Sequence, residues 1–219
     1  MDELADRYPP LNGGACCLDF VNTLEPGADG GRDRDHLGTD YSGVLSWSAY
    51  AGLIDAGTER RLRTRAATHP QLARWVAAEA HDLRAQLLAT FTAVAAGDPL
   101  PPAALAGIGL AYADALAAGT LRSTGSAAHW SWDDADDAGD ADLRAPLRPI
   151  AVSAIDLLTG DQTERVKHCA GCPVLFLDTT RNGSRRWCLM RYCGNVQKSR
   201  RQARQRRAAR AAGRQVSNL

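Results

Sequence analysis

The chain has 219 residues, of which 45% are hydrophobic and 23% charged, and its formal net charge is +1. This small value hides an uneven distribution: residues 1–164 carry 12 Arg and Lys against 24 Asp and Glu, whereas residues 165–219 carry 14 against 1. Such a division indicates an acidic body joined to an end that binds polyanions. The acidic N-terminus lacks the apolar core of a signal peptide, and no window approaches the roughly 18 apolar residues of a membrane helix. We therefore expect a cytoplasmic protein with no membrane partner.

The first apolar run covers residues 15–23, with the sequence ACCLDFVNT. A buried strand and the first turn of a helix both explain its apolar positions, because periodicity does not separate them over so few residues. Cys16 and Cys17 are expected to behave as small buried hydrophobic residues. For the polar side chains, capping or hydrogen bonds to the following loop are favoured over a ligand pocket. The pocket, if formed, would be lined by Asp19, Asn22, Thr23 and Trp47.

Helical patterns follow, separated by glycine and proline. Ser46 is a candidate N-cap for a helix that stops at Gly57, and Thr58 is a candidate N-cap for a second helix over residues 59–68. Apolar residues at three- and four-residue spacings predict a long amphipathic helix over residues 71–96. Further helices are expected at residues 102–119 and 146–159.

Between the last two helices, residues 121–123 and 128–132 read as short strands joined through Gly125, which predicts a β-hairpin packed on the helices. The acidic run at residues 133–142 lacks the spaced ligands and central glycine of a calcium-binding EF-hand loop. A solvated loop is therefore the favoured interpretation of this run.

Four cysteines dominate the C-terminal region. Cys169 and Cys172 form a C-x2-C pair, fifteen residues follow, and Cys188 and Cys193 form a C-x4-C pair. In a reducing compartment this spacing is typical of a zinc site rather than of disulfides. Four thiolates complete a tetrahedral site and leave no position for a substrate, so we predict one structural Zn²⁺ on which local folding depends. The side chains expected to form the small core of this finger are Phe176, Leu177 and Trp187.

The same stretch resembles the CGNR-type zinc finger, a bacterial module that usually follows an ABATE domain in proteins regarded as transcription regulators. The resemblance rests on the CxxC knuckle, VLFLD at 174–178, RNGSRR at 181–186, WC at 187–188, Met190, and CGN at 193–195. The LDFVNT segment at residues 18–23 resembles the opening motif of ABATE domains. One position departs from the family pattern, because Val196 stands where the family has the arginine of its name.

Together these patterns predict a mainly α (α+β) protein. A helical N-terminal domain with a small β-hairpin would be followed by a treble-clef-like four-cysteine zinc finger and a basic C-terminal helix. The boundary is expected at residues 160–162, which divides the chain into an ABATE-like sensory or dimerisation domain, residues 1–162, and a CGNR-like finger with its basic helix, residues 163–219.

Beyond Cys193, residues 195–212 contain good helix formers and many basic residues but no apolar stripe. Such a segment is partly disordered on its own, whereas in a DNA major groove its side chains would release counterions. The loop at residues 181–186 would lie near the same surface. The residues expected to contact DNA are Arg181, Asn182, Ser184, Arg185, Arg186, Asn195, Gln197, Lys198, Arg200, Arg201, Arg204 and Arg207.

The resulting hypothesis is a bacterial, nucleoid-associated regulator of transcription that binds double-stranded DNA. The resemblance and the domain layout add a small-molecule effector and a homodimer as expected partners. An RNA-binding protein is the alternative, since arginine-rich helices also bind RNA grooves. A redox-responsive zinc switch is a further alternative, because oxidation of the thiolates would release the metal. An enzyme is not expected, because no nucleophile–base pair, phosphate loop or open metal site is recognisable.

Overall fold

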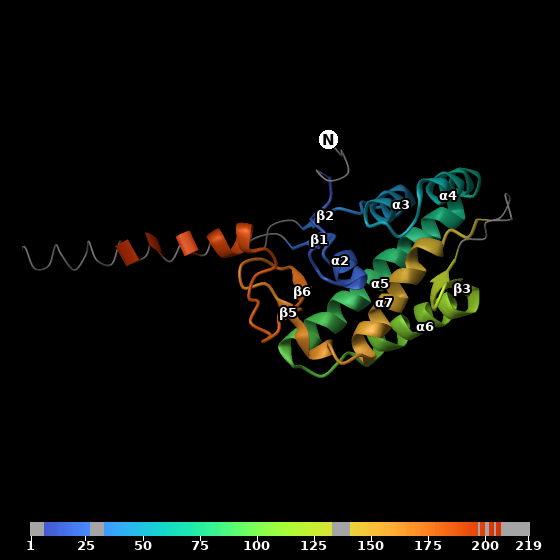
Figure 1. The fold of residues 1–219 in the computed structure, drawn as a ribbon. Helices are drawn as coiled ribbons and strands as arrows, with labels where there is room; N and C mark the ends of the chain where they lie inside the picture. The colour runs from blue at the N-terminus through green and yellow to red at the C-terminus, as the bar shows by residue number, and fades with distance from the viewer. Residues whose placement is uncertain are drawn as a thin grey trace, which may run out of the picture.

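The computed structural model of the protein describes residues 7–26, 33–132 and 141–196, together with 198–199, 202–203 and 205–206. Its α-helices are α2 (Cys16–Val21), α3 (Tyr41–Tyr50), α4 (Ala56–Thr68), α5 (Pro70–Ala96), α6 (Pro102–Ala118) and α7 (Arg148–Thr159) (Figure 1). The shorter helical turns are η2 (Ala145–Leu147), η3 (Thr163–Arg165) and η4 (Met190–Gly194), the last of which is π-helical. The mainly helical fold predicted from the sequence is confirmed.

The strands of the described chain form three separate antiparallel pairs. The strands are β1 (Leu24–Glu25) with β2 (Arg34–Asp35), β3 (Thr120–Thr124) with β4 (Ala127–Ser131), and β5 (Val166–His168) with β6 (Leu175–Leu177). The β3–β4 hairpin turns at Gly125, where φ is +78°. Trp132 Nε1 donates to the Ala115 carbonyl of α6 at 2.8 Å, which anchors the predicted hairpin to a helix. Most of the predicted acidic loop, residues 133–140, lies outside the described residues.

Aspartates begin two of the helices. The Asp40 carboxylate accepts from the backbone of Gly43 at the start of α3, and the Asp55 carboxylate accepts from Thr58 N at 2.7 Å at the start of α4. The predicted N-caps Ser46 and Thr58 are therefore wrong. Ser46 lies inside α3, because the carboxylate six residues earlier already satisfies the free N–H groups of the first turn.

The longest helix, α5, has 27 residues, with Pro70 in its first turn and Gly97 after its last. Gly97 adopts φ +73°, which ends the helix in a left-handed conformation that glycine tolerates best. No helix within the described ranges is long and apolar enough to span a membrane.

The short apolar run at the N-terminus forms helix α2 rather than a strand. Its Leu18 and Phe20 side chains are fully buried, and the Phe20 ring lies 5.0 Å from that of Trp47 on α3. Helix α2 packs against both α5 and α7. The apolar side chains of α2 thus belong to the core of the helical body.

The core of the body continues into the C-terminal region. Strands β5 and β6 lie beside α5 and α2, at the end of the bundle opposite α4 (Figure 1). Their side chains Val166, Leu175 and Leu177 belong to the same buried apolar cluster as Leu18 and Phe20. The finger is therefore attached through a shared core as well as through the chain.

Candidate metal centre and nucleic-acid surface

The four cysteines that the sequence singled out meet at one point. Their sulfur atoms all lie within 4.8 Å of one another. The sulfur of Cys188 is 3.5 Å from that of Cys172 and 3.6 Å from that of Cys193. In a tetrahedral site with Zn–S bonds of about 2.3 Å, neighbouring sulfurs are about 3.8 Å apart. The four donors therefore fit a structural zinc ion.

The backbone around the cysteines supports such a site. Cys169 N donates to the Val174 carbonyl at 2.9 Å, and Ala170 N donates to the Arg186 carbonyl at 3.0 Å. These two bonds fold the first cysteine pair into a knuckle against the second. Burial raises the pKa of the Cys172 thiol to about 12. A bound dication would supply the charge that lets neighbouring buried thiolates form together.

The finger has a small core of its own beside the metal site. Phe176 is fully buried in a cluster with Cys169 and Cys188, and the half-buried Trp187 packs against this cluster. Both side chains were expected there. Leu177 points instead into the core of the body, because neighbouring residues of a strand face opposite sides.

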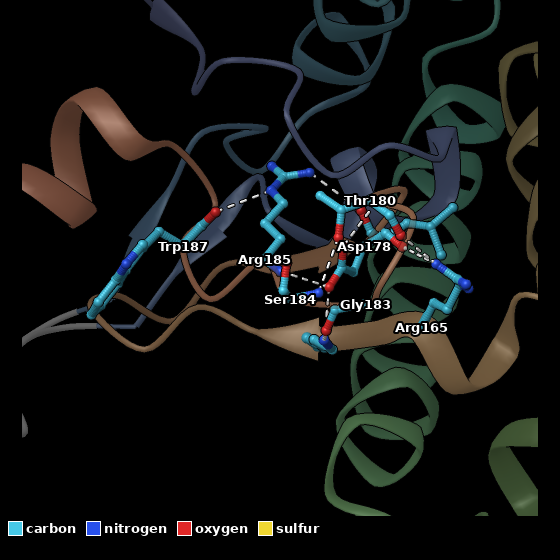
Figure 2. A network of polar contacts seen from close by, with 9 residues as sticks. Arg165, Asp178, Thr180, Gly183, Ser184, Arg185 and Trp187 are labelled. Atoms are coloured by element: carbon cyan, nitrogen blue, oxygen red, sulfur yellow. Dashed lines mark hydrogen bonds and ion pairs between the residues drawn. The ribbon is translucent and has the colours of Figure 1, made fainter.

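A buried carboxylate organises the loop that follows β6 (Figure 2). Asp178 is 0% exposed and accepts from Lys167 Nζ at 2.7 Å, Thr180 Oγ1 at 2.6 Å and Arg185 N at 2.9 Å. Burial alone would raise the pKa of Asp178, but these hydrogen bonds hold it well below its usual range. Arg165 completes the network by donating to the Thr180 carbonyl at 2.8 Å. The loop is thereby fixed by bonds from both of its ends.

Arg185 has a different position from the one expected of a DNA contact. Its Nε donates to the Trp187 carbonyl at 3.0 Å, and its Nη2 donates to the carbonyls of Cys188 and of Asn12 in the body. The guanidinium also lies over the Phe176 ring, 4.4 Å from the centroid. The donors of Arg185 hold the zinc knuckle to the body, whereas its predicted contact with DNA stays a prediction.

The outer edge of β6 is closed by the N-terminal segment. Asn22 Nδ2 donates to the Leu175 carbonyl and Asn22 Oδ1 accepts from Leu175 N, both at 2.9 Å. Two residues further along, Leu177 N donates to the Gly13 carbonyl at 2.7 Å. The Asn22 side chain and the Gly13 carbonyl thus bond to the backbone groups of β6 that a third strand would otherwise pair.

The other residues proposed for a ligand pocket lie close to this seam. Thr23 is buried and accepts from Arg84 Nη1 at 2.9 Å, so its hydroxyl bonds within the body. Asp19 accepts from Gly13 N at 2.7 Å, and burial raises its pKa to about 6. Asp19 and Trp47 line a surface hollow of about 280 Å³. Asn22 and Thr23 do not line it, because both bond within the protein.

Most of the described residues predicted to contact DNA lie at the surface. The exposed ones are Arg181, Asn182, Ser184, Arg186, Asn195 and Lys198. Figure 1 shows the helical pieces beyond Gly194 leading away from the body. Five further predicted contacts lie outside the described residues, namely Gln197, Arg200, Arg201, Arg204 and Arg207.

Two features of this region were missed from the sequence. Arg191 is exposed between the finger and the basic helix, with its guanidinium 5.1 Å from the Tyr192 ring centroid. Its charge alone was a sufficient signal. The pairing of Asn22 with Leu175 joins residues 153 positions apart, and no local pattern in the sequence indicates it.

A helical body joined through a shared core to a four-cysteine finger defines a zinc-finger protein with a built-in helical domain. Comparison with family models gives two matches. The ABATE model, described as "Putative stress-induced transcription regulator", matches residues 14–161, and the CGNR zinc finger model matches residues 165–207. No curated protein matches the chain. Because the first model covers more than half of the 219 residues, the chain belongs to the ABATE family, and it carries a CGNR zinc finger.

Proposed function

We propose that this protein is a bacterial transcription regulator that binds duplex DNA through the outer side of its zinc finger and the basic helix that follows. One observation carries the proposal. Asp178 is the single acidic residue after Glu164, and its carboxylate is 0% exposed and bonded inside the finger. The exposed basic side chains described after Glu164, which include Arg181, Arg186, Arg191 and Lys198, therefore have no exposed acidic side chain among them.

The proposed contacts divide into two groups. Arg181, Arg186, Arg191 and Lys198 would bind phosphates and so fix the position of the finger on the duplex. Asn195, at the start of the basic helix, has the amide group that pairs with adenine in the major groove. About six phosphate contacts would weaken binding roughly a thousandfold between 50 and 200 mM salt.

The salt dependence of binding tests this proposal. The full chain and a version that ends at Gly194, both loaded with zinc, are titrated with the same duplex at several salt concentrations. We expect truncation to remove most of the affinity and to flatten the dependence on salt, because 8 of the 14 basic residues after Glu164 lie beyond Gly194. An unchanged slope would show that the tail is not the electrostatic contact.

Two further measurements define the partner. Structured RNA titrated at matched salt distinguishes DNA from RNA, and equal or tighter RNA binding would overturn the choice of duplex DNA. Retention of genomic fragments would show whether a few sites share a motif, and a palindromic motif would indicate a homodimer.

The helical body is proposed to sense a small molecule, and the protein is proposed to be cytoplasmic, nucleoid-associated and without enzymatic activity. The seam formed by Asn22 and Gly13 on β6 supports the sensing role. A change in the position of α2 would move groups that bond directly to the finger. A ligand that binds one arrangement more tightly than another would therefore change the affinity for DNA.

A further inference from the structure

A cavity of about 400 Å³ lies between α5, α6 and the segment leading into α7. It is separate from the hollow beside Asp19, and its volume falls within the roughly 300–1,000 Å³ of small-molecule pockets. Each helical segment lines it with residues three or four positions apart, such as Leu83 on α5, Leu110 on α6 and Leu147 before α7. One continuous stripe of each segment therefore faces the space.

Small residues on α6 keep the cavity open. Gly107 and Ala111, one turn apart, both line it. A Cβ added at Gly107 would lie 2.3 Å from the Gln86 side chain, which occupies the place of a larger residue. Leu83 and Leu147 are buried and form an apolar wall, which the largely exposed Leu110 extends to the surface. Ion pairs join the segment before α7 to α5, and α7 to α6.

The charges around the cavity do not balance. Arg144 Nε pairs with Glu79 at 2.9 Å, and Arg148 Nε pairs with Asp114 at 3.1 Å. Arg148, which is 5% exposed, also pairs with Asp142 through Nη2. Both guanidinium groups are thus paired with carboxylates of the protein.

Asp82 lines the same space and forms no ion pair with any described residue. Four carboxylates therefore surround two guanidinium groups. The surplus negative charge and the apolar side chains line one space, which favours a ligand with a cationic group at one end and an apolar body at the other.

We propose that this cavity binds a small organic cation, an amine whose ammonium group faces Asp82 and whose apolar part lies against Leu110 and Leu147. As the effector site of the sensing domain it rests on the proposed function, whereas the binding itself does not. Helix α5 lines the cavity and also packs against β5 and β6, so an occupied cavity has a direct path to the finger.

Calorimetric titration of the full-length, zinc-loaded protein tests this proposal with three probes of one shape. The probes are 2-phenylethylamine, neutral 2-phenylethanol and anionic 3-phenylpropionate. We expect the amine to bind about tenfold more tightly than either of the others. Equal affinity for the three probes, or no binding of the amine at its solubility limit, would overturn the proposal.

Two variants locate the site. Ala111→Leu fills the cavity and should abolish amine binding, whereas Ala117→Leu, which adds the same bulk to an exposed position on α6, should leave it unchanged. Asp82→Asn should weaken amine binding about threefold to fivefold, as expected for an exposed charge pair, with no effect on the alcohol. Asp98→Asn, an exposed carboxylate outside the cavity, is its control. If Ala111→Leu does not fold, Asp82→Asn still decides the question, and an unchanged affinity there would refute the site.

These titrations contain no DNA, and the salt titrations of DNA binding contain no amine. A protein that binds DNA but not the amine would refute the cavity proposal alone. A protein that binds the amine but not DNA would refute the proposed function alone.

Discussion

The two sides of the zinc finger use similar side chains for different purposes. On the side facing the body, the β6 backbone bonds to Asn22 and Gly13, and the Arg185 guanidinium donates to carbonyls of both parts. Arg181 and Arg186, by contrast, are exposed to solvent. Position relative to the body, rather than residue type, thus determines whether an arginine stabilises the fold or is free to contact a partner.

The largest expected effect comes from removing a zinc ligand, which should unfold the zinc finger and so remove both its contacts with the body and its DNA-binding surface. Cys172→Ser should lose its zinc and its DNA binding, because the finger core around Phe176 is too small to fold without the metal. Metal analysis and DNA titration measure the two losses. Cys16→Ser, which removes a cysteine outside the cluster, should retain one zinc. A Cys172→Ser protein that still binds DNA would contradict a structural role for zinc.

Asn22→Ala should separate the finger from the body while leaving the metal site intact. The substitution leaves the N–H and C=O of Leu175 buried without partners, which costs about 2–4 kcal/mol. Urea unfolding measures this loss of stability. Asn182→Ala on the exposed loop is the matched control and should affect DNA binding alone. Equal stability of the two variants would show that the seam contributes little.

Neighbouring arginines allow a direct test of the comparison. Arg185→Ala should lower the free energy of unfolding by about 2 kcal/mol, because four backbone carbonyls lose a charged donor. Arg186→Ala should change stability by less than about 0.5 kcal/mol but lower the salt slope of DNA binding by about one. The reverse result would mean that the inner and outer sides have been assigned incorrectly.

The smallest effect concerns pH. Burial raises the pKa of Asp19 from 3.8 in the unfolded chain to about 6, so its ionisation opposes folding. The contribution of neutral Asp19 to the free energy of unfolding is fully present below pH 3.8, the pKa of the unfolded chain. It is lost as the pH rises through about 6, the pKa of the folded protein. Asp19→Asn should therefore stabilise the protein by about 1–2 kcal/mol at pH 7.5, provided that its amide oxygen still accepts from Gly13. Urea unfolding at pH 5.5 and 7.5 checks this, and a gain that does not grow with pH would contradict it.

Local patterns in the sequence were sufficient for much of the fold. The apolar spacing over residues 71–96 located α5, and the cysteine spacing located the metal centre. The helix starts at Asp40 and Asp55 were missed because serine and threonine nearby are also good N-caps. Such choices depend on which side chain reaches the free N–H groups, and that is a matter of geometry.

The candidate site was predictable only where neighbouring residues in the sequence are sufficient to identify it. Cysteine and arginine identify a zinc site and a basic surface by composition. The sequence RNGSRR does not distinguish Arg185 from Arg186, because their partners lie in separate segments of the chain. In the same way, Asn22 was considered for a ligand pocket, whereas its partner is the backbone of Leu175.

The bond between Asn22 and Leu175 also has a consequence for synthesis of the protein. Its two residues are 153 positions apart, so α2 leaves the ribosome long before β6 exists. During that interval Leu18 and Phe20 have their helical neighbours, but the place of Leu175 and Leu177 in the core is empty. The packing around α2 is therefore complete only after strand β6 of the finger has been synthesised.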